Sequence, residues 1–314
     1  MNKNNTNNIN PNYITGLTDG DGSFSVGIYS KPDSKLGWTV KLRFLITAGY
    51  NPANYIMLQN IQQFFGGIGN INIKPQDNTC NYIVNSLPEL KIIQQHFINY
   101  PLCTYKLVYF QLWSEVLNII SLNGKLTLEL LLKIIAFKSH FKLGVSESLL
   151  EAFPNNKSIT IPNYSPNLSI IDFHWLAGFI NSDGSFSLTV SKEKSRKLGE
   201  ACGYYISITQ NEISKIVLDY IAEFWGYGKV YYQAKGVYVY KINSKVYIND
   251  FINKFEEAGA KIQGAKALDY TDFCKGINIV NNKTHLTREG LEDFRALTKG
   301  MNSTRTYFGN RLVS

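Results

Sequence analysis

Residues 14–24 read ITGLTDGDGSF, and residues 176–186 read LAGFINSDGSF. The two stretches lie 162 positions apart, and each ends a run of small and apolar residues in Asp-Gly-Ser-Phe. Self-similarity at a fixed separation is the signature of an internal repeat. If a whole domain is repeated, other features of the sequence should recur at nearly the same separation.

Three further features recur at a separation of 159 or 160 residues. The first is a glycine pair after an aromatic-ended apolar segment, the second is a lysine, and the third is a Leu-Thr-x-Glu sequence. The pairs are Gly67-x-Gly69 with Gly226-x-Gly228, Lys106 with Lys266, and Leu126-Thr127-x-Glu129 with Leu286-Thr287-x-Glu289. This register predicts a tandem duplication of a domain of about 150 residues, which is an ordinary domain size.

The hydrophobic periodicity of the first copy changes in a fixed order along the chain. Residues 22–30 and 37–47 alternate between apolar and polar side chains, which is typical of half-buried strands. The second copy repeats the pattern with GSFSLTVS, CGYYISITQ, KVYYQ and GVYVYKIN. This order of patterns predicts that each half has an α+β fold with an antiparallel sheet. In the first half, the expected helices and strands are 12–20, 22–30, 37–47, 52–65, 69–75, 79–85, 88–98 and 102–119.

The composition of the chain suggests where the two domains begin and end. Residues 154–171 contain three prolines and read as a linker. The sequence therefore predicts an N-terminal domain at 1–153 and a C-terminal domain at 172–314. The opening decamer MNKNNTNNIN is Asn-rich and has no apolar run, so residues 1–10 are expected to form a disordered arm.

The charge balance favours a polyanionic partner. The chain has 32 Lys and Arg residues against 24 Asp and Glu residues, a formal net charge of +8. Nucleic acid is the leading candidate, and an anionic membrane surface is the second. The most apolar run, LTLELLLKIIAF at 126–137, is short and contains Glu129 and Lys133. It predicts a buried amphipathic helix, so no membrane partner is expected.

The four cysteines give no sign of a metal site or a disulfide framework. They are widely separated, with no C-x-x-C pair and no nearby histidine cluster. Reduced thiols in a reducing compartment are the simplest interpretation. The residues are Cys80, Cys103, Cys202 and Cys274.

The repeated motif fits neither of two familiar ion-binding loops. Asp-Gly is a strong turn signal, so the plainest interpretation is a pair of helix-ending turns. An EF-hand loop needs Gly at its sixth position and Glu at its twelfth, where this chain has Phe24 and Ser30, or Phe186 and Lys192. A phosphate-binding glycine loop is also excluded, because no G-x-G-x-x-G or G-K-[ST] sequence occurs in the motif.

The helical part of each motif carries a strip of small residues. Gly16 and Gly20 are four residues apart, as are Gly178 and Ser182, so each pair lies on one face of its helix. Glycine inside a helix costs roughly 1 kcal/mol relative to alanine, which indicates a packing reason for its presence. We expect the two motif helices to pack on each other along these strips.

Such packing would bring Asp21 and Asp183 together where the two sheets meet. Two neighbouring carboxylates disfavour being charged together unless they share a cation. Mg²⁺ suits a site of carboxylate, carbonyl and water oxygens with few protein ligands. With a basic, polar double sheet beneath it, such a site suits phosphodiester hydrolysis.

With these features assembled, the sequence resembles the LAGLIDADG homing endonucleases, in their single-chain, two-motif branch from fungal organelle introns. ITGLTDGDG and LAGFINSDG are similar to the two copies of the motif that names the family. The resemblance extends over essentially the whole chain. It includes YPLCTYK, GAKALDYTDFCK, the two LT-x-E segments and the closing KGMNSTR.

The resemblance implies a role for several residues near the motif. Asp21 and Asp183 are expected to be the catalytic, metal-binding carboxylates, with the backbone carbonyls of Gly20 and Ser182 as further ligands. The basic residues near the scissile phosphates are expected to be Lys106 and Lys266. Taken alone, either lysine would be interpreted as a solvated surface residue, and only the repeat register favours the site.

Two positions differ between the copies. Family members often place a glutamine at the end of the second strand to help hold the attacking water. Gln210 fits this position in the second copy, but Ala48 stands there in the first. Unequal cutting of the two DNA strands is therefore an open possibility. Asn181 replaces the usual first acid of the motif, which Asp19 keeps, and that acid is expected to be structural.

The alternating strands also predict which side chains face DNA. A twelve-residue strand spans about 40 Å, comparable with one DNA turn of roughly 34 Å. The two sheets would form a saddle over the major groove. Because the two faces differ, the target should be asymmetric. The residues expected to face double-stranded DNA, unless this is only a solvated sheet face, are Ser25, Tyr29, Lys41, Arg43, Asn70, Asn72, Lys74, Ser187, Thr189, Tyr205, Ser207, Lys229 and Tyr231.

The resemblance implies a monomeric enzyme that makes a double-strand break with 3′ overhangs in support of intron homing. It implies Mg²⁺ as the cofactor, with Ca²⁺ binding but not supporting efficient cleavage, and a mitochondrial location. Two alternatives stay open at this point. One is a maturase that binds intron RNA, and the other is a DNA-binding protein on the same scaffold that does not cut.

Overall fold

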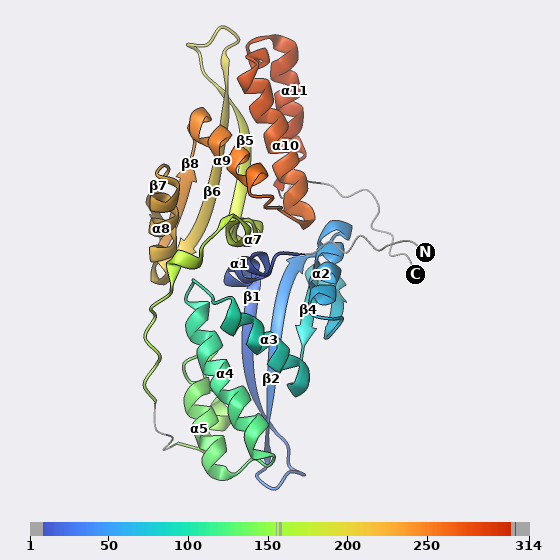
Figure 1. Cartoon of the computed structure of the whole chain (residues 1–314), viewed down its shortest axis with the longest axis vertical. Helices are drawn as coiled ribbons and strands as arrows, with labels where there is room; N and C mark the ends of the chain where they lie inside the picture. Colours follow the sequence, from blue (N-terminus) through green and yellow to red (C-terminus); the bar gives the residue numbers. More distant parts are fainter. Residues whose placement is uncertain (1–8, 155, 157–158, 303–304, 306–314) are drawn as a thin grey trace, which may run out of the picture.

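Two similar halves are stacked along the long axis of the molecule in the computed structural model (Figure 1). The structure describes residues 9–154, 156, 159–302 and 305. Each half has a four-stranded antiparallel sheet, with strand order β1-β2-β4-β3 in the first half and β5-β6-β8-β7 in the second. The α+β fold and the duplication predicted from the sequence are confirmed.

The first half contains α1 (Pro11–Asp21), β1 (Gly22–Ser30), β2 (Trp38–Gly49), α2 (Pro52–Phe64), β3 (Asn70–Lys74), η1 (Pro75–Asp77), β4 (Thr79–Val84), α3 (Leu87–Asn99), α4 (Lys106–Asn123), α5 (Leu128–Lys138) and α6 (Glu147–Ala152). The short 3₁₀ turn η2 (Leu168–Ile170) follows. The second half contains α7 (Phe173–Asp183), β5 (Gly184–Lys192), β6 (Glu200–Asn211), η3 (Glu212–Ser214), α8 (Lys215–Trp225), β7 (Lys229–Ala234), β8 (Val237–Ile242), α9 (Lys245–Glu257), α10 (Gly264–Asn281), η4 (Thr284–Leu286) and α11 (Arg288–Lys299).

The helices α1 and α7 pack against each other at the boundary between the halves (Figure 1). An ideal Cβ atom built on Gly16 would lie 1.9 Å from the carbonyl oxygen of Trp175, and one built on Gly178 would lie 2.0 Å from that of Tyr13. Real Cβ atoms do not approach other atoms so closely, so only glycine allows this contact. The expected packing along the strips of small residues is confirmed.

Each motif helix runs directly into the first strand of its sheet. Asn10 caps α1 and Asp172 caps α7, each with a side-chain oxygen that accepts a backbone N–H in the first turn. At the other end, Gly22 and Gly184 have extended backbone and begin β1 and β5. Each aspartate that precedes the glycine is therefore held at a rigid junction between helix and strand.

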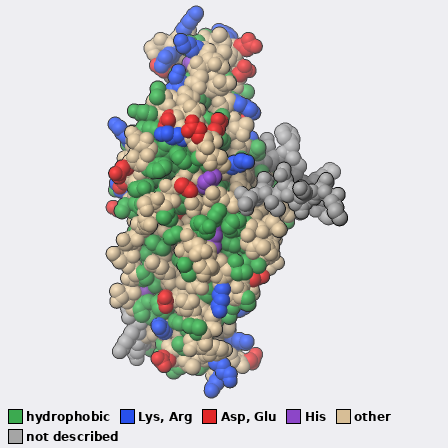
Figure 2. All heavy atoms as spheres, viewed as in Figure 1, with side chains coloured by type: hydrophobic (Ala, Val, Ile, Leu, Met, Phe, Trp, Pro, Cys, Tyr) green, Lys and Arg blue, Asp and Glu red, His purple; other side chains and the backbone are tan. Residues whose placement is uncertain are grey.

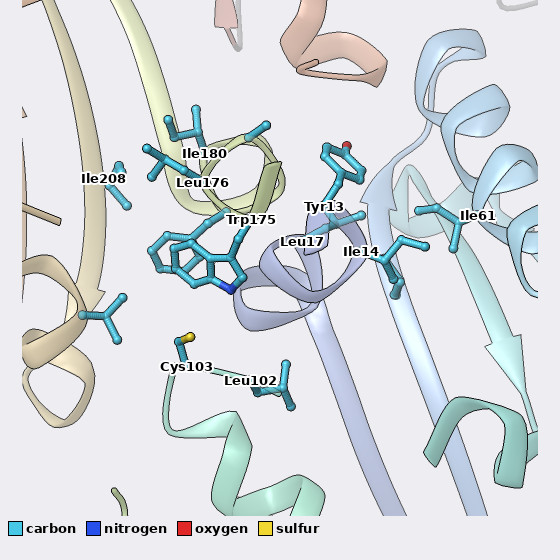
Figure 3. Packing of buried hydrophobic residues seen from close by; sticks show 14 of the residues in the cluster. Tyr13, Ile14, Leu17, Ile61, Leu102, Cys103, Trp175, Leu176, Ile180 and Ile208 are labelled. Atoms are coloured by element: carbon cyan, nitrogen blue, oxygen red, sulfur yellow. The ribbon is translucent and has the colours of Figure 1, made fainter. Parts of the chain in front are cut away.

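The helices cover one face of each sheet and leave the other face open. The covered face of the first sheet carries Phe24 and Phe44, which pack on Phe97 and Trp113 from the helices. Most buried apolar residues of both halves join in one cluster across α1 and α7, and Leu131, Ile135 and Leu149 form a small second cluster. Figure 3 shows part of this cluster, with Trp175 of α7 beside α1 and the segment that contains Leu102 and Cys103. One core therefore fixes how the two sheets lie relative to each other.

The element boundaries largely agree with the sequence predictions. The expected helix at 102–119 begins later, at Lys106, because the residues before it form the turn that binds Asp19. The apolar run at 126–137 forms α5, whose inner face is buried. No helix within the described residues is both long enough and apolar enough to cross a membrane.

The predicted N-terminal arm needs a correction. Residues 1–8 lie outside the described residues, but Ile9 is buried and Asn10 caps α1. The apolar side chain of Ile9 joins the core and the amide of Asn10 satisfies the first turn of the helix, so the ordered chain begins before residue 11. The limits 1–153, 154–171 and 172–314 for the two domains and their linker remain a proposal.

Candidate active site and nucleic-acid interface

The carboxylates of Asp21 and Asp183 lie at the adjacent ends of α1 and α7. Asp183 reaches the other half, since an ideal Cβ atom on Gly20 would lie 3.0 Å from its Oδ2 atom. The same Cβ atom would lie 1.9 Å from Oγ of Ser182. Glycine at position 20 therefore leaves the space in which the two helix ends and their acids come together.

The two carboxyl groups have perturbed pKa values. Burial raises the pKa of Asp183 to about 6, and the charge of Lys106 opposes this rise while that of Asp21 adds to it. Burial also raises the pKa of Asp21, against the charges of Lys106 and Lys266. Desolvated, neighbouring acids of this kind are typical of catalytic or cation-binding sites.

The lysines predicted for the site lie beside these acids. Lys106, the first residue of α4, donates from Nζ to the carbonyl oxygens of Gly20 and, at 3.2 Å, Thr18. Lys266, near the start of α10, donates to the carbonyl oxygen of Gly184 at 2.8 Å. Burial lowers the pKa of both lysines, and nearby aspartates oppose this. Both lysines therefore belong to one polar cluster at the centre of the molecule.

The glutamine predicted for the second site contacts its acid. Gln210 donates from Nε2 to Oδ2 of Asp183. Register places Ala48 at the matching position in the first half, because Gly22 pairs with Ile46 and Gly184 pairs with Ile208. Ala48 has no polar side-chain atom, so the two acids have different surroundings.

A pocket of about 300 Å³ opens beside Asp21. It is bounded by both halves of the molecule, because Lys266 of the second half faces Asp21 and Ala48 of the first. The lining residues are Asp21, Ala48, Gly49, Asn51, Asn54, Met57, Asn181, Ala265, Lys266, Asp269 and Asn302.

Asp19 lies in the core and holds the start of α4. Its carboxylate accepts hydrogen bonds from the backbone N–H groups of Cys103 and Thr104, from the Thr104 hydroxyl and from the Trp175 indole. Burial raises the pKa of Asp19, and these donors oppose the rise. In the second half, Asn181 accepts from the backbone N–H of Gln263 at 3.0 Å. The amide of Asn181 makes this contact without a charge.

The donor set at the centre fits a hard divalent cation. It offers two carboxylates and backbone carbonyl oxygens, the ligands that Mg²⁺ and Ca²⁺ prefer. In the described part of the chain, no three His, Cys, Asp or Glu side chains gather into a site that could hold a metal ion by themselves. Carbonyl oxygens, water or substrate would have to complete the coordination. The carbonyl group of Gly20 also accepts Lys106, so this lysine and a cation would compete for it.

The side chains predicted to face DNA share the open face of each sheet. In the first sheet Ser25 pairs with Arg43 and Asn72 pairs with Asn81, which in turn faces Thr47. All of the predicted first-half residues are exposed: Ser25, Tyr29, Lys41, Arg43, Asn70, Asn72 and Lys74. In the second sheet the shared face carries Ser187, Thr189, Tyr205, Ser207, Lys229 and Tyr231.

One basic residue of the second face was missed. Lys241 pairs with both Ser207 and Lys229, and its Nζ atom lies 3.7 Å from the centre of the Tyr205 ring. The sequence VYVYKI alternates between two side-chain types that are both compatible with a core, so alternation did not show which face is open. Residue pairing supplies the answer, because Lys241 must share a face with its partner Lys229.

The two ends of the long axis carry several basic side chains, with acidic ones among them. The space-filling view shows Lys and Arg side chains at both ends (Figure 2), where the β1–β2 and β5–β6 turns lie (Figure 1). These turns carry exposed Lys31 and Lys35 at one end, and Lys194, Arg196 and Lys197 at the other. Positive charge therefore extends to the tips of both long hairpins.

Comparison with known proteins agrees with this geometry. The family model for the LAGLIDADG endonuclease matches residues 14–117 and 176–277. Probable intron-encoded endonuclease 3 of Neurospora crassa is 30% identical over 299 residues, which cover 94% of this chain and 55% of that protein. Probable intron-encoded endonuclease 2 of the same fungus is 31% identical over 298 residues, which cover 90% of this chain and 63% of the relative. The chain thus spans little more than half the length of these relatives.

Solved structures match over nearly their whole length. The I-SmaMI LAGLIDADG homing endonuclease bound to cleaved DNA has a TM-score of 0.89 at 34% identity, with 95% of this chain and 98% of that one covered. I-GzeII in complex with its DNA target has a TM-score of 0.85 at 29% identity, with 95% and 100% covered. Motif, acids, sheets and matches agree, and the chain belongs to the LAGLIDADG endonuclease family.

Proposed function

We propose that this protein is a site-specific DNA endonuclease that makes a double-strand break with 3′ overhangs in a long, asymmetric target and so supports intron homing. The observation that carries the proposal is the meeting of Asp21 and Asp183, with Lys106 and Lys266 beside them, at the junction of two open polar sheets. Structural neighbours with the same two-fold arrangement are bound to DNA.

The residues of the site divide the work of phosphodiester hydrolysis. Asp21 and Asp183, with the carbonyl groups of Gly20 and Ser182, would hold the divalent ion, for which we propose Mg²⁺. When bound, this ion would lower the pKa of the attacking water and stabilise the leaving 3′ oxygen. A structure of I-SmaMI with uncleaved DNA was obtained in the presence of calcium ions, so we expect Ca²⁺ to support binding without efficient cleavage here.

Lysine and glutamine side chains would complete the chemistry. Lys106 and Lys266 offer positive charge at the centre, where the transition state gathers negative charge on the phosphoryl oxygens. I-SmaMI has been solved with two of its lysines replaced by alanine, singly and together. The lysines of this fold are therefore candidates for a role in its activity. Gln210 orients the carboxylate of Asp183 and can donate to a water beside it.

The open sheet faces would bind the duplex. β2 and β6 each have 12 residues, about 40 Å of strand, so each sheet can follow about one DNA turn of roughly 34 Å. Hydrogen-bonding side chains on this face can distinguish base pairs in the major groove. The two faces carry different residues, which fits an asymmetric target.

Cleavage of a plasmid that carries the uninterrupted host-gene junction tests the proposal. We expect a double-strand break with 3′ overhangs in Mg²⁺, binding without efficient cleavage in Ca²⁺, and no cleavage in EDTA. Asp21→Asn and Asp183→Asn should each abolish cleavage and keep binding, whereas Glu151→Gln, at an exposed acid of α6, should behave as wild type. Two outcomes would contradict the proposed endonuclease function. In one, the protein binds the junction but never cuts it in Mg²⁺, and in the other, it binds only intron RNA.

The relatives support a mitochondrial location. One is a protein in ND4 intron 1 of Podospora anserina, and another is a cox1 intron-2 protein of Schizosaccharomyces pombe. We therefore propose that the chain acts in the mitochondrion. A tagged protein found outside mitochondria by microscopy and fractionation would contradict this.

A further inference from the structure

The helices α4 and α10 carry Lys106 and Lys266. At the start of each helix, a backbone N–H group donates a hydrogen bond to a side chain of the opposite half. The backbone N–H of Tyr105, just before Lys106, donates to Oγ of Ser214 in the second half at 3.0 Å. The backbone N–H of Ala265, just before Lys266, donates to Oδ1 of Asn54 in the first half at 2.8 Å. Each lysine therefore follows a residue that is bound across the boundary.

The two contacts are equivalent under the internal repeat. Asn54 and Ser214 are 160 residues apart, and so are Tyr105 and Ala265. Asn54 lies in the first turn of α2, and Ser214 is the residue that caps α8. The halves differ in residue type at these positions, but both supply a side-chain oxygen. The same crossed geometry therefore occurs at both sites with different chemistry.

The contact at Asn54 is too close to be incidental. Gly264, the first residue of α10, has φ +59°, and an ideal Cβ atom there would lie 2.4 Å from Oδ1 of Asn54 and 3.2 Å from Sδ of Met57. Figure 1 shows α2 beside the start of α10 across the boundary. Ser214 is also enclosed, with 3% of its surface exposed. Ser214 is therefore buried, and Asn54 is half-buried, at these contacts.

These hydrogen bonds hold the start of each helix that carries a lysine. The first N–H groups of a helix have no partner within the helix, so an external acceptor sets how its first turn is oriented. Asn54 also donates from Nδ2 to the carbonyl oxygen of Gly49 at 2.8 Å. It therefore joins the end of β2, where Ala48 faces the pocket, to the start of the helix that carries Lys266.

We propose that Asn54 and Ser214 are positioning residues, in which Asn54 aligns Lys266 and Ser214 aligns Lys106, so that each lysine depends on the opposite half of the molecule. The proposal rests on the endonuclease function proposed above. Its consequence is specific, because a defect at one cross-boundary contact should impair cleavage of one DNA strand and spare the other.

Single-turnover cleavage of a duplex labelled differently on each strand tests the proposal. Lys266→Ala should slow the cleavage of one DNA strand. Asn54→Ala should slow the cleavage of that same strand by about tenfold, because a small misplacement of a catalytic group lowers the rate. Ser214→Ala should in the same way slow the strand that Lys106→Ala slows. In both alanine variants, the cleavage rate of the other strand should stay within twofold of wild type. The dissociation constant for DNA in Ca²⁺ should also stay within twofold.

Conservative variants separate positioning from folding. Ser214→Thr keeps the acceptor oxygen and should restore most of the rate that Ser214→Ala loses. Asn54→Gln keeps the amide but moves its oxygen by one methylene, so it should show the strand-specific defect even if the alanine variant folds poorly. Gln59→Ala, at an exposed position of the same helix, is the matched control and should cleave both strands as wild type.

The outcomes distinguish this inference from the proposed function. Equal slowing of both strands, unchanged cleavage in both alanine variants, or weaker DNA binding with normal cleavage would overturn the positioning roles alone. A wild-type protein that binds the duplex and cuts neither strand in Mg²⁺ would overturn the endonuclease, and the positioning roles with it.

Discussion

At the residue scale, the duplication made the central acids and lysines predictable. Asp21, Asp183, Lys106 and Lys266 recur in one register, so a single sequence was enough to single them out. Asn54, which contacts the other half, was not predictable, because an asparagine in the first turn of a helix usually serves its own helix. Its partner across the boundary is visible only in three dimensions.

The raised pKa of Asp183 leads to a prediction about stability. Its pKa of about 6 in the folded protein exceeds the ordinary value, so the folded state favours the neutral form. The contribution of the neutral carboxyl to the free energy of unfolding is complete below the pKa that Asp183 has in the unfolded chain. It is lost as the pH rises through 6. In EDTA, we expect Asp183→Asn to increase the free energy of unfolding by roughly 2 to 3 kcal/mol at pH 8, and by little at pH 4.

Chemical denaturation of both proteins across this pH range measures the effect. Asp77→Asn, at an exposed acid of η1, serves as the control and should show no such difference. A variant that is no more stable than wild type at pH 8 would mean that the Asp183 carboxylate is not destabilised in the folded protein.

At the element scale, the strands were well predicted and the helix contacts were not. Residues 22–30 match β1 because alternation reports directly on which face is buried. The start of α4 was placed too early because the Asp19 contacts that form the preceding turn lie far away in sequence. Periodicity describes an element, and it says little about which distant residue will end or begin it.

The packing of α1 on α7 should tolerate no side chain at Gly178. An ideal Cβ atom there would lie 2.0 Å from the carbonyl oxygen of Tyr13 and 2.6 Å from the backbone N of Leu17, and backbone atoms cannot rotate away. We expect Gly178→Ala to cost about 3 kcal/mol or more in unfolding free energy, because the helices must separate.

Thermal and denaturant unfolding check the Gly178 prediction. Gly49→Ala is the matched control, since a Cβ atom on Gly49 meets nothing within 4 Å. Equal stability of Gly178→Ala and Gly49→Ala would show that the two motif helices are not in this tight contact.

The packing of α3 on α1 and α2 contains a buried histidine with a pH-dependent consequence. His96 lies among Phe64, Phe65 and Phe97, and burial lowers its pKa to about 4. Between pH 6.5 and 4, His96 binds a proton in the unfolded chain but stays neutral in the folded protein. The free energy of unfolding therefore falls as the pH falls. This histidine alone should remove roughly 3 kcal/mol over that interval.

Comparison with His96→Gln isolates this contribution, because glutamine stays polar and does not titrate. The variant should show a flatter loss of unfolding free energy between pH 6.5 and 4, while His174→Gln should keep the wild-type slope. Parallel slopes for His96→Gln and wild type would contradict a neutral buried histidine.

At the scale of the whole molecule, the sequence predicted two sheets but not how firmly they are joined. The continuous core across the boundary arises from contacts between residues that are far apart in sequence, such as Trp175 and Asp19, which are 156 positions apart. Such contacts leave no periodic trace in one sequence. Lys241 was missed for a related reason, since its face depends on its pairing with another strand.

The basic open faces predict a steep salt dependence of DNA binding. Each neutralised phosphate should contribute about −0.9 to the slope of log affinity against log salt concentration. We expect the Lys229→Ala/Lys241→Ala double variant to have a shallower slope than wild type. Lys91→Ala, on the exposed side of α3, should leave the slope unchanged.

Binding titrations from about 50 to 200 mM salt measure these slopes. A flat salt dependence for the wild-type protein would argue that the open sheet faces do not follow a duplex. An equal slope for the double variant would remove Lys229 and Lys241 from the phosphate contacts.

The contact between α1 and α7 is made by backbone atoms through glycine, and this has a consequence for how such a protein can change. For the endonuclease proposed above, substitutions on the open face of either sheet would alter what that half reads, while the backbone contacts through Gly16 and Gly178 would keep the two acids in place. In such an enzyme, target preference could drift, or be redesigned one half at a time, while the stagger between the two nicks stayed unchanged.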